Sequence, residues 1–288
     1  MITLRDLHSL DDCKQVDELE KRIWGYSDAE DLVPAIMLFL CAKRGGILIG
    51  AEEADGTSVG FAFSMASIVD GKPAQWSHMM GVVPGTREQG LGRRLKLAQR
   101  DRALAMGIEL IEWTFDPLQA VNAHLNFAKL GGISSTYAEN IYGDSSSVLH
   151  RGTPTDRLIL EWWIQRPHVE RRIAAADGGA LSGAGFVARD QSVASAPVLN
   201  ELSCRDPWDM PAETTLPPED GRVLIRVPAR FSEMQAQEPA LALAWRMQTR
   251  ALFTTCFARG YRAVDFFKDP QQGGAYLLAK TEASAASG

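Results

Sequence analysis

The sequence predicts an α/β protein of the α+β kind, with a mixed, mostly antiparallel central sheet and a smaller C-terminal α+β domain. Three apolar strand patterns, at 47–53, 59–69 and 75–83, are joined by turn residues and therefore indicate an antiparallel meander. The third strand leads through a glycine-containing turn into a long helical pattern. The length of 288 residues exceeds what one core usually needs, which favours two domains.

A short edge strand and two helices are expected before the meander. Residues 1–5 suit the strand, and apolar residues at helical spacing run from Ser9 to the helix end at Gly25. A second helix is predicted from Pro34 to Lys43. Because this second helix is apolar nearly all round, we expect it to be well buried.

Helices and strands alternate after the glycine turn. A helix is expected at 90–106 and a strand at 108–115. Asp116 and Pro117 are typical of a helix start, because Asp caps the first amides and Pro suits the first position. That helix is expected to end near 129–132. Two strands complete this part, at 133–142 and 157–165, with a loop rich in Ser, Gly, Thr and Pro at 143–156.

The composition changes between 166 and 221, where Ala, Gly, Ser, Pro and Asp dominate and periodicity is weak. This stretch indicates a connector, partly irregular, with some order around Trp208. A strand pattern then returns, followed by a long helix opened by Pro239 and two more strands. The expected domains are residues 1–166, the connector 167–221 and a C-terminal α+β domain at 222–288.

The net charge of −6 argues against a general nucleic-acid binder. Basic residues are nevertheless concentrated in 84–102, which holds six of them against only Glu88 and Asp101. Such a local patch suits a small polyanion better than DNA, although a solvated helix face would have the same pattern.

The four cysteines are scattered and form no Cys-x-x-Cys pair, so neither a metal site nor a disulfide framework is expected. Reduced thiols in a cytoplasmic protein are the simplest interpretation. The N-terminal residues do not resemble a signal peptide. The longest apolar run, 32–42, contains Pro34 and is too short to span a bilayer, so no membrane association is expected.

The stretch Met79–Arg94 joins a strand, a glycine turn and a helix start, an arrangement suited to holding phosphates on free helix amides. A P-loop is excluded because Leu91 and Gly92 stand where Lys and Ser or Thr are required. A dinucleotide fingerprint is disfavoured because Leu95 replaces the third glycine and the preceding strands look antiparallel.

The remaining pattern is Val-x-Pro-x-x-Arg-x-x-Gly-x-Gly, formed by Val82, Pro84, Arg87, Gly90 and Gly92. It resembles motif A of the Gcn5-related N-acetyltransferases, the GNAT superfamily, and the order of elements over residues 1–165 agrees. The segments 113–118 and 156–163 also look like a family of predicted GNAT proteins with an extra C-terminal region.

The resemblance implies that the turn binds the pyrophosphate of acetyl-CoA or another acyl-coenzyme A, mainly through backbone amides. It also implies that the strand before the turn pairs with the pantetheine arm, and that an amide near Val82 polarises the thioester carbonyl. Arg93 or Arg94 would add charge near the phosphates. The implied cofactor-binding residues are Val82, Val83, Arg87, Glu88, Gln89, Gly90, Leu91, Gly92 and Arg93. No metal is expected.

The acceptor side departs from the family, because Phe127 stands where many GNAT enzymes have a tyrosine acid. Tyr137 and Tyr142 are alternative acids, unless they only pack in their strands. His78 is a candidate base or a packed histidine. Glu112, within an apolar strand, is a candidate base or faces outward near the strand end. Asp116 is better explained as a helix cap.

The sequence thus favours an acyl-CoA-dependent N-acetyltransferase acting on a small-molecule amine. The alternative is a non-catalytic GNAT module that binds acyl-CoA in a regulatory role, which Phe127 favours. A third hypothesis is a protein amine docked by the C-terminal domain, which no charged run in 222–288 supports. The oligomeric state, for which a homodimer is one option, is not determined by the sequence.

Overall fold

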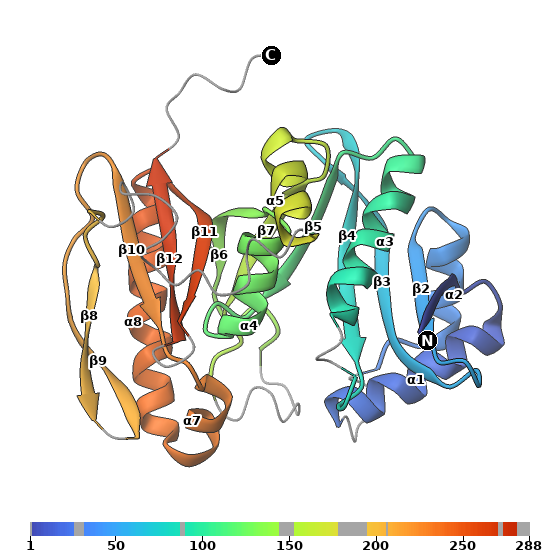
Figure 1. Cartoon of the computed structure of the whole chain (residues 1–288), viewed down its shortest axis with the longest axis horizontal. Helices are drawn as coiled ribbons and strands as arrows, with labels where there is room; N and C mark the ends of the chain where they lie inside the picture. The colour runs from blue at the N-terminus through green and yellow to red at the C-terminus, as the bar shows by residue number, and fades with distance from the viewer. Residues whose placement is uncertain are drawn as a thin grey trace. The chain divides into compact units, whose positions relative to one another are not determined.

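The structure of the chain is a computed structural model (Figure 1). It describes residues 2–25, 32–86, 90–143, 153–177, 195–205, 207–269 and 273–280. The described chain forms two compact units, the first up to Trp113 and the second from Thr114 onward. The domain limits expected at 166 and 221 stay predictions, because these units group residues by compactness rather than by independent folding.

The first unit contains a five-stranded sheet in the order β1-β2-β3-β4-β5. Neighbours from β1 to β4 are antiparallel, which confirms the predicted meander, whereas β4 and β5 are parallel. The strands are β1 (Thr3–Asp6), β2 (Ile47–Glu52), β3 (Ser58–Val69), β4 (Lys72–Val82) and β5 (Leu110–Phe115), the last of which ends in the second unit.

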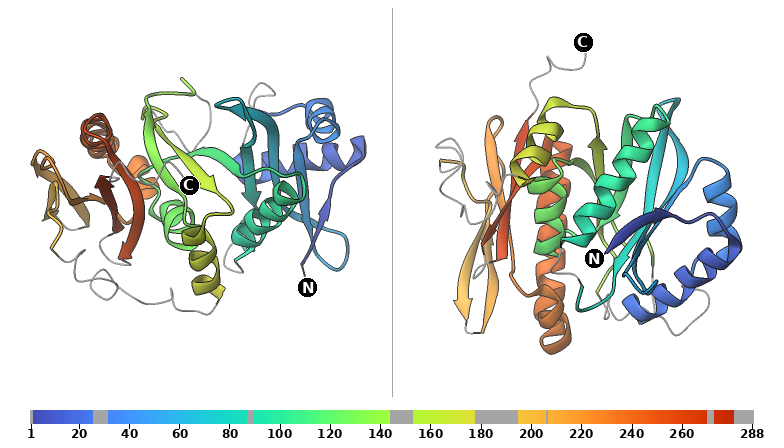
Figure 2. Two further views of the ribbon diagram at one scale, coloured as in Figure 1. Left: turned by 90° about the horizontal axis from the view of Figure 1, so that it is seen from above. Right: turned by 45° about the vertical axis from the view of Figure 1, so that its right-hand side comes forward.

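Three helices cover this sheet: α1 (Leu10–Trp24), α2 (Ala35–Lys43) and α3 (Leu91–Ala105). The predicted start of α1 is confirmed, because Ser9 and Asp12 form a reciprocal capping box. A Cβ atom at Gly81 of β4 would meet α1, while the preceding Met80 reaches Gly92 of α3. Since successive strand residues point to opposite faces, α1 and α3 cover opposite faces of the sheet (Figure 2).

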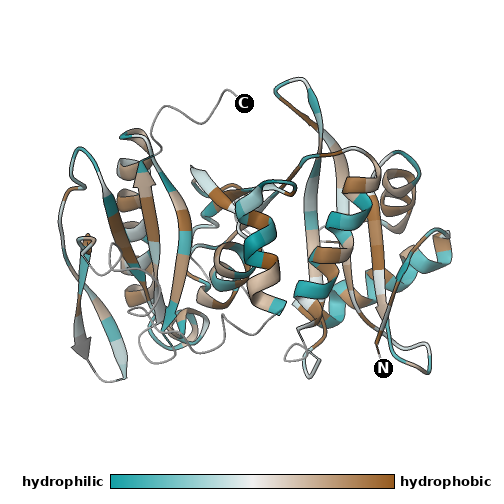
Figure 3. Ribbon diagram, turned by 45° about the horizontal axis from the view of Figure 1, so that its top comes forward, coloured by the Kyte–Doolittle hydropathy of each residue, from teal (hydrophilic) through white to brown (hydrophobic). Residues whose placement is uncertain are grey.

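The prediction that the second helix is well buried is wrong. Only Leu38 of α2 is buried, whereas Ile36, Met37 and Leu40 are 50%, 48% and 47% exposed. A helix on the surface of a sheet can bury one face only, so apolar residues on all sides leave the others in solvent. Figure 3 shows α2 mostly in the brown of hydrophobic residues.

The second unit contains an antiparallel sheet in the order β7-β6-β11-β12-β10 and a separate hairpin of β8 and β9. Residues from the predicted C-terminal domain therefore extend the sheet begun by β6 and β7. The strands are β6 (Ile133–Ala138), β7 (Arg157–Trp163), β8 (Asn200–Arg205), β9 (Trp208–Thr214), β10 (Arg222–Val227), β11 (Tyr261–Asp269) and β12 (Gly273–Lys280).

The helices of the second unit differ in two places from the expectation. The helix expected to start at Asp116–Pro117 begins at Ala120 and continues as a π-helical segment. The expected connector contains helix α5 and the β8–β9 hairpin, while residues 178–194 lie outside the described residues.

The described helices of the second unit are α4 (Ala120–Ala123), η3 (His124–Lys129), α5 (Pro167–Asp177), α7 (Phe231–Gln237) and α8 (Pro239–Ala258). None of the helices described is both long and apolar enough to cross a membrane.

Candidate acyl-CoA site

Strand β4 has different neighbours along its length. It pairs with β3 from Lys72 to Val82, but its parallel pairing with β5 covers only Gln75 with Ile111 and Trp76 with Glu112. The described part of β4 beyond Trp76 therefore runs with β3 as its paired neighbour. A strand that loses its neighbour on one side leaves backbone groups directed there, where an extended ligand can pair with them.

The turn after β4 brings the chain to the start of α3 through two left-handed glycines. Gly85 has φ 92° and Gly90 has φ 68°. Gly90 is the N-cap residue of α3 and, being glycine, offers no side chain to the first helix amides. The first turn of α3 contains no acidic residue. A Cβ at Gly90 would have no described atom within 4 Å, and helix amides without an intrahelical partner suit an anion.

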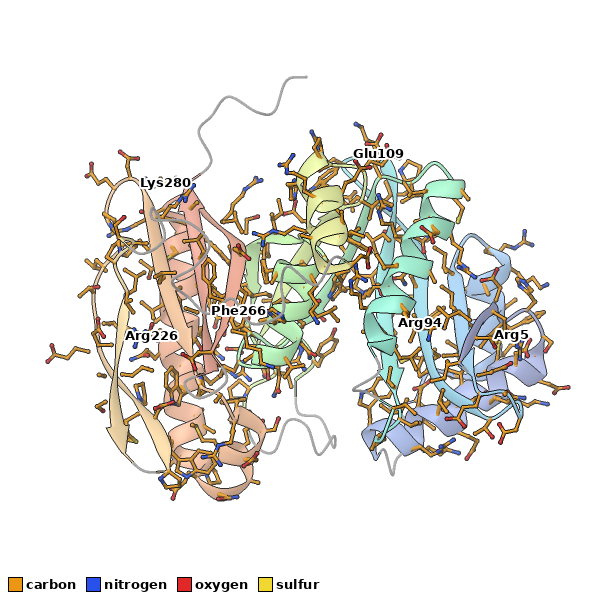
Figure 4. All side chains as sticks on the ribbon, in the orientation of Figure 1. Arg5, Arg94, Glu109, Arg226, Phe266 and Lys280 are labelled. Atoms are coloured by element: carbon orange, nitrogen blue, oxygen red, sulfur yellow. The ribbon has the colours of Figure 1, made fainter. Side chains whose placement is uncertain are left out.

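The other residues predicted to bind coenzyme A differ in burial and in contacts. Leu91 is fully buried, so only its backbone can serve a ligand. Arg93 is half-buried. Arg94, labelled in Figure 4, donates a hydrogen bond to the carbonyl oxygen of Ile2 at 2.7 Å and therefore holds the N-terminal segment. Arg87, Glu88 and Gln89 lie outside the described residues.

The basic helix face is only partly exposed, because Lys96 of α3 points into the core. Its ammonium donates to Oγ of Ser77 at 2.8 Å and lies 3.5 Å from the ring centroid of Trp113. Burial lowers the pKa of Lys96 well below its ordinary value. This lysine cannot contribute to a surface patch for a polyanion.

His78 and Glu112 have different surroundings in the first unit. His78 lies at an irregularity in the β3–β4 pairing, with its ring edge-on to Phe63 at 6.4 Å between centroids. Its side chain is exposed, and partial desolvation lowers its pKa. Glu112 is half-buried beside the short parallel pairing. His78 is therefore accessible to a ligand on its side of the sheet, whereas Glu112 is less so.

Phe127, at the position of the usual tyrosine acid, and Tyr142, an alternative acid, both lie in the second unit. Phe127 is fully buried, with Phe115 and Tyr276 at 5.9 and 5.5 Å between centroids. This position is therefore part of a core and carries no acid. Tyr142 is 44% exposed, and its hydroxyl lies 2.6 Å from Oγ1 of Thr114. Tyr142 thus has an accessible hydroxyl, as an acid would need.

The order of elements in the first unit is strand, two helices, three antiparallel strands, glycine turn, helix and parallel strand. Of the motif residues, Val82 and Pro84 stand where β4 enters the turn, and Gly90 and Gly92 stand where α3 begins. This order is the one that the resemblance to the Gcn5-related N-acetyltransferases implies. The mixed, mostly antiparallel sheet confirms the fold class expected from the sequence.

Comparisons with known proteins are limited to structure. No protein-family model and no curated protein matches the sequence. The ribosomal-protein-S18-alanine N-acetyltransferase from Escherichia coli is 17% identical over 58% of this chain and 96% of its own, with a TM-score of 0.46. PaiA N-acetyltransferase from Thermoplasma acidophilum, in complex with coenzyme A, is 17% identical over 56% and 98%, with a TM-score of 0.40. A spermidine N-acetyltransferase chimera from Vibrio cholerae and hSSAT is 15% identical over 57% and 95%, with a TM-score of 0.44.

Two further residues that the GNAT resemblance singled out have structural roles. Tyr137 is largely buried and donates its hydroxyl to Oδ2 of Asp156 at 2.8 Å. Burial and the nearby carboxylate raise its pKa, so it is a poor alternative acid. Asp116 accepts from the amide of Leu118 at 2.9 Å, so it caps the turn before α4 rather than a helix starting at Pro117.

Two arginines of α8 form ion pairs with aspartates, which the sequence analysis did not predict. Both carboxylate oxygens of Asp116 accept from the buried Arg246 at 2.8 Å. Burial alone would raise the pKa of Asp116, but Arg246 holds it below its ordinary value. Arg250, one turn later, donates to both oxygens of the buried Asp156 at 2.7 and 2.8 Å. The spacing of these arginines on an apolar helix was the available signal.

Glu20 of α1 is the other residue that sequence reasoning did not single out for chemistry. Its side chain is fully buried, and Oε2 accepts from the amide of Val33 at 3.3 Å. Oε1 has no hydrogen-bond partner within the described structure. Burial, with a smaller contribution from Asp17, raises the pKa of Glu20 to about 7. The signal in the sequence was a carboxylate within the apolar stripe of the first helix.

A cavity of about 470 Å³ lies in the second unit, between α8 and the stretch 212–217 at the end of β9. Its lining residues include none of the predicted site residues. It therefore has no part in the site described above.

Proposed function

We propose that the glycine turn and the beginning of α3 bind the pyrophosphate of an acyl-coenzyme A, with acetyl-CoA the expected co-substrate. The observation that carries this proposal is the left-handed Gly90, which begins α3 with open space at its Cβ position, after a strand whose parallel pairing has ended at Trp76. The amides of Leu91, Gly92 and Arg93 would donate to the phosphate oxygens. Val82 and Val83, at the end of β4, would lie beside the pantetheine arm and the thioester.

We propose further that the chain transfers the acyl group to a small amine. The reaction needs a neutral amine, a polarised thioester carbonyl and a proton for the departing thiolate. The backbone near Val82 would polarise the carbonyl. Tyr142 has an exposed hydroxyl suited to the thiolate, while His78 and Glu112 stay candidate bases. The cytoplasmic location expected from the cysteines also stays a prediction.

The second candidate function is a GNAT module that binds acyl-CoA without turning it over. The observation that favours it is the burial of Phe127 in an aromatic core, which removes the usual tyrosine acid from this position. This function requires the same donor site, so binding alone does not separate it from catalysis. Release of free thiol from acetyl-CoA with a panel of amines would separate the two.

The donor site can be tested by the thermal shift that acetyl-CoA produces in the wild type and in Gly90→Trp. Gly71→Trp is the matched control, because Gly71 also has a positive φ, 76°, and open space around its Cβ position. Both variants should lose stability, on the order of 1 kcal/mol or more, from the left-handed backbone. Only Gly90→Trp should lose the ligand shift. No shift in the wild type with any acyl-CoA would refute the proposal, and a shift retained in Gly90→Trp would place binding elsewhere.

A further inference from the structure

The buried carboxylate of Glu20 is half satisfied. Oε2 accepts one long hydrogen bond from the Val33 amide, while Oε1 has no partner within the described structure. A buried polar atom without a partner costs free energy and is uncommon in folded proteins. Each carboxylate oxygen can accept more than one hydrogen bond. Glu20 therefore retains the capacity to accept from a donor that the described residues do not supply.

Glu20 lies on the side of α1 whose later residues touch strand β4. Residues three and four positions along a helix lie on the same side, so Glu20 shares its side of α1 with Ile23 and Trp24. A Cβ at Gly81 would lie 2.8 Å from Cδ1 of Ile23 and 3.2 Å from Cζ2 of Trp24. Gly81 directly precedes Val82. Glu20 is thus about one helical turn, ~5 Å along the axis, from the helix residues that touch β4 beside the proposed thioester position.

His78 belongs to the same side of the sheet. Trp24 of α1 packs edge-on against Phe61 of β3 at 5.7 Å, and His78 packs against Phe63, two residues further along β3. Residues two apart in a strand point to one face. The side of the sheet that α1 covers therefore carries both Glu20 and the exposed His78.

The charges around Glu20 favour a cation. Asp17 lies one turn earlier on α1, next to the Ala35 amide at the start of α2, and burial raises its pKa. Among the residues of α2, Lys43 is the one cation, and it stands at the far end of the helix. His78 on β4 has a lowered pKa and so stays neutral near pH 7. Lys21 of α1 also acts on Asp17 through its charge, while its ammonium pairs with the exposed Glu18. The acidic pair of Glu20 and Asp17 can accept further hydrogen bonds, and an ammonium group has three N–H donors.

We infer that Glu20, with Asp17 beside it, binds the ammonium group of a primary amine acceptor and takes its proton. The inference rests on the proposed acyl transfer. One N–H proton of the ammonium passes to Oε1 of Glu20. The freed nitrogen lone pair forms the bond to the thioester carbonyl carbon, the C–S bond breaks, and the second proton lost by nitrogen ends on the thiolate of coenzyme A. A guanidinium is not a suitable acceptor, because it does not release its proton to a carboxylate.

The binding step can be tested without knowing the natural acceptor. Protein labelled with carbon-13 in the glutamate carboxyl groups is titrated with methylammonium and, separately, with tetramethylammonium, which has no N–H donor. The Glu20 signal is assigned by its loss in Glu20→Gln. It should move with methylammonium and stay fixed with tetramethylammonium. A signal that moves with neither, or equally with both, overturns the inference, and this result does not depend on coenzyme A.

The proton transfer is tested by kinetics once an amine from a panel containing spermidine and n-butylamine releases thiol from acetyl-CoA. Glu20→Gln should lower kcat/KM at pH 7 by about 100-fold or more, and the deficit should shrink as the pH approaches the pKa of the amine. Glu18→Gln, an exposed carboxylate on the same helix, should behave as the wild type. An unchanged rate in Glu20→Gln, or a deficit equal at all pH values, contradicts the role. An acetyl-CoA thermal shift retained in Glu20→Gln separates this failure from failure of the donor site.

Discussion

Glu20→Gln should change how the stability of the chain depends on pH. In the folded protein the pKa of Glu20 is about 7, against an ordinary value of 4.5. At about 1.4 kcal/mol for each tenfold change in proton affinity, this difference corresponds to about 3 kcal/mol. Between these two pH values the folded state holds the proton more tightly than the unfolded state, so the wild type loses this stability as the pH rises. Glutamine has the same shape and does not titrate, so the variant lacks the loss.

The assay is urea unfolding of the wild type, Glu20→Gln and the control Glu18→Gln at pH values from 4.5 to 8. The free energy of unfolding of the wild type, relative to Glu20→Gln, should fall by about 3 kcal/mol over this range. Glu18 is exposed and pairs with Lys21, so the wild type and Glu18→Gln should keep a constant difference. A constant difference for Glu20→Gln as well would show that the carboxylate is not desolvated, and the inferred amine site would lose its basis.

Three other substitutions test the remaining contacts. Arg246→Ala leaves the carboxylate of Asp116 buried without its bidentate partner, and should lower the free energy of unfolding by about 3–5 kcal/mol in urea denaturation. An effect below 1 kcal/mol would contradict the burial of this pair. Lys96→Met removes an ammonium whose pKa is depressed by burial; the wild type should gain stability relative to this variant as the pH rises towards 10.5, and a flat difference would argue against burial of the charge. Tyr142→Phe should reduce the rate of thiol release from acetyl-CoA at least tenfold with the acetyl-CoA thermal shift unchanged, and full turnover would remove Tyr142 from the mechanism.

The backbone conformation around the glycine turn could be predicted from the sequence because its signals are local. Glycine at the helix start, turn residues between the strands and the capping box at Ser9 each act within a few residues. The meander and the strand after α3 follow from periods of 2 and 3.6 residues. These features do not depend on the partner that each element finds in space, so the structure agrees with them.

Side-chain burial and long-range ion pairs could not be predicted in the same way, because they depend on contacts between distant parts of the chain. Arg246 meets Asp116 across 130 residues, and Arg250 meets Asp156 across 94. Lys96 reads as part of a basic helix face but is buried against Trp113. Helix α2 reads as buried but exposes most of its large apolar residues. Helical periodicity indicates which residues share a side but not which side meets the sheet.

The sequence by itself determined the order of elements and the glycine turn, since these depend on backbone conformation and on neighbours along the chain. Only the tertiary structure decided that Phe127 is core, that Tyr142 has an exposed hydroxyl and that Glu20 is buried with one oxygen unpartnered. The physical reason is that the pKa and hydrogen-bonding capacity of a side chain depend on how much water its neighbours remove, and those neighbours come from distant parts of the chain.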